Sequence, residues 1–307
     1  MPTYDRRTFT KAALATVASA RWNTAAGAPG VPRLGVVVGV SATTTPEQAI
    51  AKVHRLAFPT CQLAVGTAPL ALAAPIREAL TKYQVEATAL MTLGEGRMVW
   101  NLREGPLTIG IIPPATRRAR IDALKRASDL AKACGVKAVH THCGFIPEGP
   151  NEPLYADAVA AITEVAGYCR SNGQTFLMET GQETPITLLR AIEDVGLDNL
   201  GVNLDVANLI LYGKGEPVGA LDVIGPYVRG LHAKDGLYPT DPYGLGREVP
   251  IGKGRVRFAE VIAGLRRISY TGPITIEREI TGPKQERDII ASKLYLEQLI
   301  NREYRGT

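Results

Sequence analysis

The chain has 307 residues, of which 45% are hydrophobic and 21% charged, so it is long and apolar enough to bury one large core. Its formal net charge of +5 is small for this length, and Arg6, Arg7 and Lys11 supply part of it at the N-terminus, which argues against a nucleic-acid-binding protein. The four cysteines form no CxxC pair, which excludes zinc-ribbon and thioredoxin-type motifs; we expect buried free thiols, with one disulfide left open.

The first segment, residues 1–32, is interpreted as an export signal followed by a linker. The stretch DRRTFTK precedes the mildly apolar AALATVASA, a pattern that resembles a twin-arginine signal with a cleavage site near Ala20. This pattern predicts a periplasmic or secreted protein, and a basic N-terminus on a cytoplasmic enzyme is the alternative. No later segment approaches a membrane span, so no stable membrane insertion is expected.

Eight short apolar, β-prone runs follow, separated by helical patterns. Alternating strands and helices predict parallel strands with right-handed crossovers, and eight such units close into a (β/α)8 TIM barrel, an α/β fold. A single domain over residues 33–307 accounts for all of them. The predicted strands are residues 34–40, 61–66, 85–93, 136–145, 175–181, 199–206, 228–235 and 273–279.

Three of the intervening helices are clear. One runs from about residue 116 to Cys134 with an apolar stripe and a stop at Gly135, one begins near Pro153, and the last carries Ile289, Leu296 and Ile300 on one face. Two connections, residues 94–113 and 236–255, are longer than linking requires. Long loops at the catalytic end of a barrel commonly serve as lids or binding walls.

Four metal-capable side chains stand at the ends of four successive predicted strands. They are Glu179 in LMETG, Asp205 in VNLDV, His232 in GLHAKD and Glu277 in TIERE. Because the carboxyl ends of barrel strands converge on one mouth, we expect these side chains to meet there. Isolated acidic residues at strand ends often cap the next helix instead, but four on consecutive strands favour one site.

Three carboxylates and an imidazole form an oxygen-rich ligand set that favours Mn²⁺, or Mg²⁺, with Co²⁺ and Zn²⁺ tolerated. A divalent ion at a carbonyl and its neighbouring hydroxyl acidifies the adjoining C–H. Glu179 and Glu277 are the natural pair to take and return that proton, with Asp205 and His232 acting mainly as ligands. The sequence therefore predicts a metal site for proton transfer next to a carbonyl.

Several nearby polar or aromatic side chains are candidate substrate contacts. His140 and His142 share one face of a strand, and His142 lies nearer the predicted mouth, whereas His140 is expected to be an interior residue. Asn208, three residues after Asp205, is a candidate donor to a sugar hydroxyl, with a hydrogen bond to the backbone of its turn as the alternative. Trp100 stands in the first long loop as a ring for sugar stacking or as a packing anchor. The remaining candidates are Lys234, Lys253 and Arg278, which are otherwise surface charges.

At these motifs the chain resembles the xylose isomerase-like TIM-barrel superfamily, in its sugar phosphate isomerase/epimerase branch, over about residues 34–300. The resemblance implies one divalent ion held by Glu179 in METGQE, Asp205 in NLDVAN, His232 in LHAKD and Glu277 in TIERE. Two departures argue against a free ketohexose substrate: the common D-x-x-H reads D-x-x-N at Asn208, and no arginine follows His232. The related AP endonucleases bind three zinc ions with many histidines. This chain has only four histidines, which argues against a DNA-repair nuclease.

Three functions remain open. The first is a metal-dependent isomerase or epimerase acting on a small sugar or keto-sugar through an enediolate, and the second is a lyase that eliminates the aglycone of a 3-keto-glycoside at the same metal site. A non-catalytic sugar-binding barrel is the alternative from another class. The sequence is compatible with a homo-oligomer, and it identifies neither the sugar nor the number of subunits.

Overall fold

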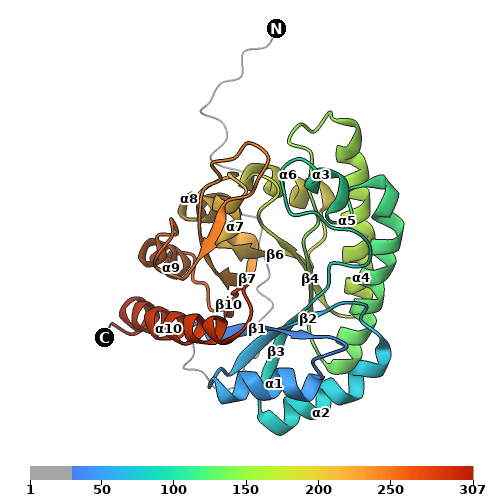
Figure 1. Ribbon diagram of the computed structural model, residues 1–307. Coiled ribbons are helices and arrows are strands. Elements are labelled where there is room, and N and C mark those ends of the chain that lie inside the picture. The colour runs from blue at the N-terminus through green and yellow to red at the C-terminus, as the bar shows by residue number, and fades with distance from the viewer. Residues whose placement is uncertain (1–29, 307) are drawn as a thin grey trace.

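The computed structural model describes residues 30–306, which fold as a closed barrel of eight parallel strands with helices around it (Figure 1). The strands follow one another in chain order, and the last pairs with the first. This confirms the predicted single-domain TIM barrel; the predicted export signal lies almost wholly outside the described residues. The barrel strands are β1 Leu34–Val40, β2 Thr60–Val65, β3 Glu86–Met91, β4 Ala138–Thr141, β5 Thr175–Glu179, β6 Leu200–Asp205, β7 Val228–Ala233 and β10 Ile274–Ile276.

Helices connect the strands on the outside of the barrel. The side chain of Thr45 and that of Gln48 cap each other's backbone N–H at the start of α1, and Gly135, at φ 80°, ends α4 in the left-handed conformation. The three predicted helices correspond to α4, α5 and α10. The bounds are α1 Pro46–Arg55, α2 Ala73–Tyr83, α3 Gly105–Thr108, α4 Pro114–Cys134, α5 Pro153–Ser171, α6 Pro185–Val195, α7 Val206–Leu211, α8 Pro217–Ile224, α9 Phe258–Arg267 and α10 Pro283–Ile300, with short turns at Leu70–Leu72, Gly225–Tyr227 and Asn301–Arg305.

The core lies between the barrel and its helices. In α4 the predicted apolar stripe of Ile121, Leu124, Ala127 and Ala131 is buried, as a helix packed on a sheet requires. All four cysteines are buried free thiols, so the expectation of unpaired cysteines is confirmed. None of the described helices combines the length and apolarity that crossing a bilayer requires.

The two long connections meet over one end of the barrel. The first contains α3, and the second contains an antiparallel hairpin, β8 Asp235–Leu237 with β9 Arg247–Val249, which the sequence did not predict. The backbone N–H of Leu102 donates to the carbonyl of Tyr243 at 2.8 Å, and the guanidinium of Arg103 lies 5.5 Å from the centre of the Tyr243 ring. The connections thus form a joined wall beside the carboxyl ends of the strands.

Candidate metal centre

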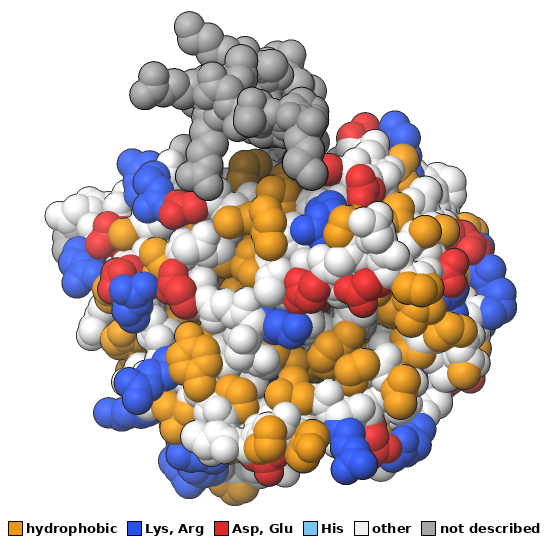
Figure 2. Space-filling model, turned by 90° about the horizontal axis from the view of Figure 1, so that it is seen from above, with side chains coloured by type: hydrophobic (Ala, Val, Ile, Leu, Met, Phe, Trp, Pro, Cys, Tyr) orange, Lys and Arg blue, Asp and Glu red, His pale blue; other side chains and the backbone are white. Residues whose placement is uncertain are grey.

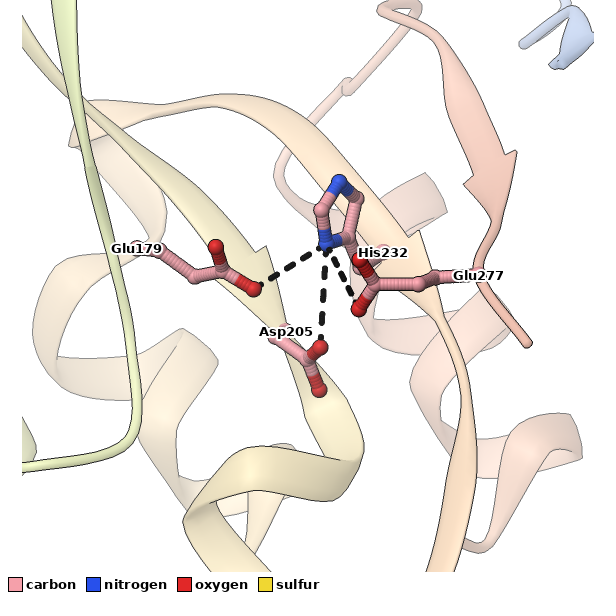
Figure 3. Close-up of side chains that lie close together, drawn as sticks. All are labelled: Glu179, Asp205, His232 and Glu277. Carbon is pink, nitrogen blue, oxygen red and sulfur yellow. Dashed lines mark hydrogen bonds and ion pairs between the residues drawn. The ribbon is translucent and has the colours of Figure 1, made fainter. Parts of the chain in front are cut away.

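Glu179, Asp205, His232 and Glu277 converge at the carboxyl ends of four successive barrel strands (Figure 3). Glu179 and Asp205 end β5 and β6, His232 is the penultimate residue of β7, and Glu277 directly follows β10. Each offers one ligand atom, and these four atoms lie within 4.8 Å of one another. The sequence-based expectation that the four side chains meet is therefore correct.

The Nδ1 atom of His232 lies at the centre of this cluster. It is 3.1 Å from Glu179 Oε1, 3.4 Å from Glu277 Oε2 and 3.7 Å from Asp205 Oδ2. The three carboxylates approach from three strands, so their oxygens surround one point rather than lining a surface. Glu179, Asp205 and His232 are buried, and Glu277 is the more accessible member.

Asp205 divides its two oxygens between structure and site. Its Oδ1 accepts hydrogen bonds from the backbone N–H groups of Ala207 at 2.9 Å and Asn208 at 2.7 Å, which caps α7. Its Oδ2 has no hydrogen-bond partner among the described residues and faces His232. Helix capping and metal ligation, which the sequence presented as alternatives, are thus compatible in this residue.

The donor set fits a divalent cation. Glu179 Oε2 and Asp205 Oδ2 are buried oxygens without a hydrogen-bond partner in the described part of the chain. Buried polar atoms are normally hydrogen-bonded, and three carboxylates this close together, two of them buried, repel one another unless positive charge lies between them. One divalent ion together with the ammonium group of Lys234 balances three carboxylates.

Lys234 is a buried residue rather than the surface charge it resembles in sequence. Its Nζ lies 3.1 Å from Glu277 Oε2, 2.6 Å from Glu279 Oε1 and 3.7 Å from Asp205 Oδ2. The ammonium group also donates to Asn208 Oδ1 at 3.3 Å, while Asn208 Nδ2 donates to Glu179 Oε1 at 3.3 Å. Lys234 and Asn208, both candidate substrate contacts, therefore lie next to the four candidate ligands, whereas Glu279 was not among the candidates.

His142 and Trp100 lie on the side of Glu179. The Nε2 atom of His142 is 3.1 Å from Glu179 Oε2, and the rings of Trp100 and His142 meet edge to face with centres 5.2 Å apart. Trp100 is 42% exposed, so part of its ring faces solvent at the mouth. Figure 2 looks down on this end of the molecule and shows charged side chains near the middle of the face with hydrophobic side chains around them.

Arg278 differs from the other candidates because its guanidinium is engaged away from the cluster. It pairs with Glu248 of β9 at 2.8 Å and with Asp288 of α10 at 3.0 Å. These pairs fasten the hairpin to the segment that carries Glu277. Substrate binding by Arg278 stays a prediction, and the contacts described here give it a structural role.

The pKa shifts of the three carboxylates differ. Burial would raise the pKa of Glu179, but His142, His232 and His140 outweigh it and hold the pKa well below its usual range. Burial is likewise outweighed at Glu277, whose pKa Lys234 and His232 lower. Burial raises the pKa of Asp205 to about 6. The pKa values of Glu179 and Glu277 therefore lie below that of Asp205, and all three carboxylates are mainly ionised at neutral pH.

The sequence did not predict that two interior residues contact the candidate ligands. His140, expected only as an interior residue, has its Nε2 3.0 Å from Glu179 Oε2, and its position two residues before His142 was the available signal. Gln62 of β2 has its Oε1 2.8 Å from His232 Nε2. Nothing in its local sequence marks it, because the contact crosses the barrel between strands that are not neighbours.

A family model described as xylose isomerase-like TIM barrel matches residues 50–299. The chain belongs to this family. Its fold resembles that of a xylose isomerase domain protein from Planctomyces limnophilus, with a TM-score of 0.81 and 31% identity over 90% of this chain and 100% of that one. A family member from Mycobacterium smegmatis, solved in complex with magnesium, has a TM-score of 0.63 and 20% identity over 84% and 88% of the two chains, a likeness of fold alone.

Curated relatives are more distant. An uncharacterised protein of Methanocaldococcus jannaschii is 26% identical over 60% of this chain and 63% of its own length. L-ribulose 3-epimerase of Methylomonas is 27% identical over 53% of this chain and 58% of its own length. The matches thus span less than two thirds of these relatives, and they include a sugar epimerase.

Proposed function

We propose that this family member is a divalent-metal-dependent isomerase or epimerase acting on a small sugar or keto-sugar. The observation that carries the proposal is the convergence of three carboxylates on His232 Nδ1, with Glu179 and Glu277 approaching from strands on either side of β6 and β7. Mn²⁺ is the ion we expect, with Mg²⁺ as the next candidate. The epimerase among the relatives supports the sugar substrate.

A bound divalent cation would polarise the sugar carbonyl and stabilise the negative charge that develops when the neighbouring C–H loses its proton. The remaining chemistry belongs to the chain. One of Glu179 and Glu277 takes the proton as a carboxylate. The other, whose pKa is also held low, must first take up a proton from solvent before it returns one to the enediolate from the opposite side. Lys234, His142 and Asn208 line the same space and donate hydrogen bonds to sugar oxygens.

The test is exchange of the α-hydrogen. Purified protein with Mn²⁺ is incubated in D₂O with a panel of ketoses and keto-sugars, and deuterium incorporation is followed by NMR. We expect exchange on at least one substrate and a loss of about 100-fold or more in Glu277→Gln. Glu193→Gln, an exposed position on α6, is the matched control. If the protein binds a sugar but no sugar of the panel exchanges its α-hydrogen, the result would favour the non-catalytic sugar-binding barrel.

A lyase acting on 3-keto-glycosides is the second candidate. The aromatic side chains of Trp100, Tyr238 and Tyr243 are 42%, 45% and 60% exposed on the two long connections, where an aglycone would extend. In this reaction a carboxylate takes the proton at C2, the electrons of that C–H bond form a C1=C2 double bond as the C1–O bond breaks, and the leaving oxygen takes a proton from water to give the free aglycone. Free aglycone appearing from a 3-keto-glycoside, with no epimer formed, would select this candidate over the first.

We also propose export by the twin-arginine route, which the sequence pattern at Arg6 and Arg7 supports. Fusing residues 1–32 to a reporter that is active only outside the cytoplasm tests it. Export is expected with the natural pair and is expected to stop in Arg6→Lys, Arg7→Lys. Retention of the natural fusion in the cytoplasm would contradict the proposal.

A further inference from the structure

Gln62 is a buried amide on β2 whose side chain crosses the interior of the barrel. Its Oε1 lies 2.8 Å from Nε2 of His232 on β7, and its Nε2 donates to Oδ1 of Asn203 on β6 at 3.0 Å. All three residues are buried, and β2 borders neither β6 nor β7. The contact therefore connects the wall opposite the candidate ligands to one of those ligands.

The direction of these hydrogen bonds follows from the acceptor on Asn203. Because Asn203 presents its carbonyl oxygen, Gln62 must turn its NH₂ toward Asn203 and its own oxygen toward His232. An oxygen at 2.8 Å requires a hydrogen on the ring nitrogen it faces, so Nε2 of His232 is the protonated nitrogen.

Gly230 leaves the space that this amide pair needs. A Cβ atom added at Gly230 would lie 2.5 Å from Asn203 Oδ1 and 3.6 Å from Gln62 Nε2. Any side chain at this position of β7 would displace the acceptor that orients Gln62. The absence of a side chain at Gly230 of β7 thus leaves room for the hydrogen bond between Gln62 of β2 and Asn203 of β6.

We propose that Gln62 is a positioning residue that keeps His232 in the tautomer whose Nδ1 lone pair faces the three carboxylates. A neutral imidazole with hydrogen on Nε2 offers Nδ1 to a cation, and the partner of the other ring nitrogen fixes both tautomer and ring orientation. The inference rests on the proposed metal role of the four residues. It adds that the ligand is prepared from inside the barrel, by a residue that touches neither metal nor substrate.

The test compares metal affinity in matched variants, measured by calorimetric titration with Mn²⁺. Gln62→Met removes the acceptor at similar volume and is expected to weaken binding about 10- to 100-fold. Gln62→Glu keeps an oxygen facing His232, and Asn203, whose Nδ2 has no hydrogen-bond partner among the described residues, can turn its NH₂ toward the second carboxylate oxygen. This variant is expected to bind within a few-fold of the natural protein. Gln174→Met is the control, since Gln174 is a buried amide that bonds Ser128 and the Val136 carbonyl instead, and its affinity is expected to be unchanged.

Substitution with Co²⁺ adds a spectroscopic readout, because its visible absorption reports ligand geometry. We expect an altered Co²⁺ spectrum in Gln62→Met and a natural-like one in Gln62→Glu and Gln174→Met. Natural affinity and spectrum in Gln62→Met would overturn the inference, as would equal losses in Gln174→Met. If the natural protein binds no Mn²⁺, the metal site and this inference fall together, whereas loss of the Gln62 effect alone leaves the metal site standing.

A measurement on the natural protein covers the case in which Gln62→Met does not fold. The chain has four histidines, so ¹⁵N labelling of histidine and comparison with a His232→Gln sample identify the His232 ring signals. With Zn²⁺ bound as a diamagnetic probe, we expect hydrogen on Nε2 and none on Nδ1. Hydrogen on Nδ1 with a bare Nε2 would overturn the proposal.

Discussion

At the residue scale, Lys234 decides the charge balance of the candidate metal centre. Its ammonium group contacts Glu277 and Glu279 and lies near Asp205. Lys234 and Asp205 are buried, so the charges between them are weakly screened, whereas the Glu279 side chain is exposed. A divalent ion bound by the same carboxylates therefore competes with the Lys234 ammonium group for their negative charge. Metal binding and stabilisation of the reaction's negative charge should respond to this residue in opposite directions.

Lys234→Met tests that expectation. Removing the ammonium leaves more negative charge for the ion, so the affinity for Mn²⁺ should be unchanged or a few-fold higher. The rate of α-hydrogen exchange should fall about 10-fold or more, because a donor to the developing oxyanion is lost. Calorimetry and D₂O exchange provide the two measurements, with Lys132→Met on the exposed end of α4 as control. Parallel loss of affinity and exchange would contradict this account.

Glu183 gives a second residue-scale prediction, through pH. It is buried, its Oε1 has no hydrogen-bond partner among the described residues, and burial raises its pKa to about 8 from an ordinary value of 4.5. Between these values the folded chain keeps a proton that the unfolded chain releases. The protonated Glu183 therefore contributes its whole stabilising effect below pH 4.5. As pH rises from 4.5 to about 8, the free energy of unfolding falls by up to about 1.4 kcal/mol per pH unit.

Glu183→Gln keeps the neutral shape and removes the titration. Its unfolding midpoint should be close to that of the natural protein near pH 5 and clearly higher near pH 9. Thermal unfolding followed by circular dichroism across this range measures the difference. Equal pH slopes for the two proteins would show that Glu183 does not carry the effect.

At the element scale, the hairpin of β8 and β9 depends on Asp235. Its two oxygens accept hydrogen bonds from four backbone N–H groups, those of Gly236, Gly252, Gly254 and Val256, at 2.9 to 3.1 Å. A Cβ atom at Gly254 would lie 2.1 Å from Asp235 Oδ1, so the chain must pass this close without a side chain. The Asp235 carboxylate thus holds the start of the second long connection, at Gly236, to its end, at residues 252–256.

Asp235→Asn should loosen this connection, because an amide turns NH₂ toward donors where the carboxylate accepted. We expect a loss of about 2–4 kcal/mol in stability and faster hydrogen exchange of the amides in residues 236–256. Asp241→Asn at the exposed tip, where Asp241 accepts from Tyr243 and Gly244, should have a much smaller effect. Natural exchange rates in Asp235→Asn would refute this role.

The elements themselves could be predicted from sequence only in part. The eight barrel strands and α4, α5 and α10 follow from local patterns, since apolar runs and helical stripes are properties of neighbouring residues. The hairpin strands have three residues each, and non-local contacts from Asp235 and from Arg278 to Glu248 hold them. The ligands Glu179 and Asp205 stand out because they end strands, whereas Gln62 acts across the barrel, and its role depends on register that no local pattern encodes.

At the scale of the whole molecule, the candidate ligands come from β5, β6, β7 and the residue after β10, four successive strands of the closed barrel. An ion bound by all four connects half of the barrel wall. Binding to the folded chain alone stabilises it by about 2.7 kcal/mol when free ion is at 100 times the dissociation constant. Saturating Mn²⁺ should therefore raise the unfolding midpoint by several degrees, and chelation should reverse the shift.

Asp205→Asn separates this stabilisation from ordinary folding. Asparagine keeps an oxygen to cap α7 through Ala207 and Asn208 but loses the charge directed at the ion, so the variant should fold and show little or no Mn²⁺-dependent shift.

In the natural protein the Mn²⁺-dependent shift of the unfolding midpoint should shrink as pH falls. Burial would lower the pKa of His232, but Glu277 and Glu179 outweigh it and raise that pKa, so a proton competes with the ion for the ring. Differential scanning calorimetry at several pH values measures both effects, and an equal Mn²⁺ shift in the variant and the natural protein would mean that the ion binds elsewhere.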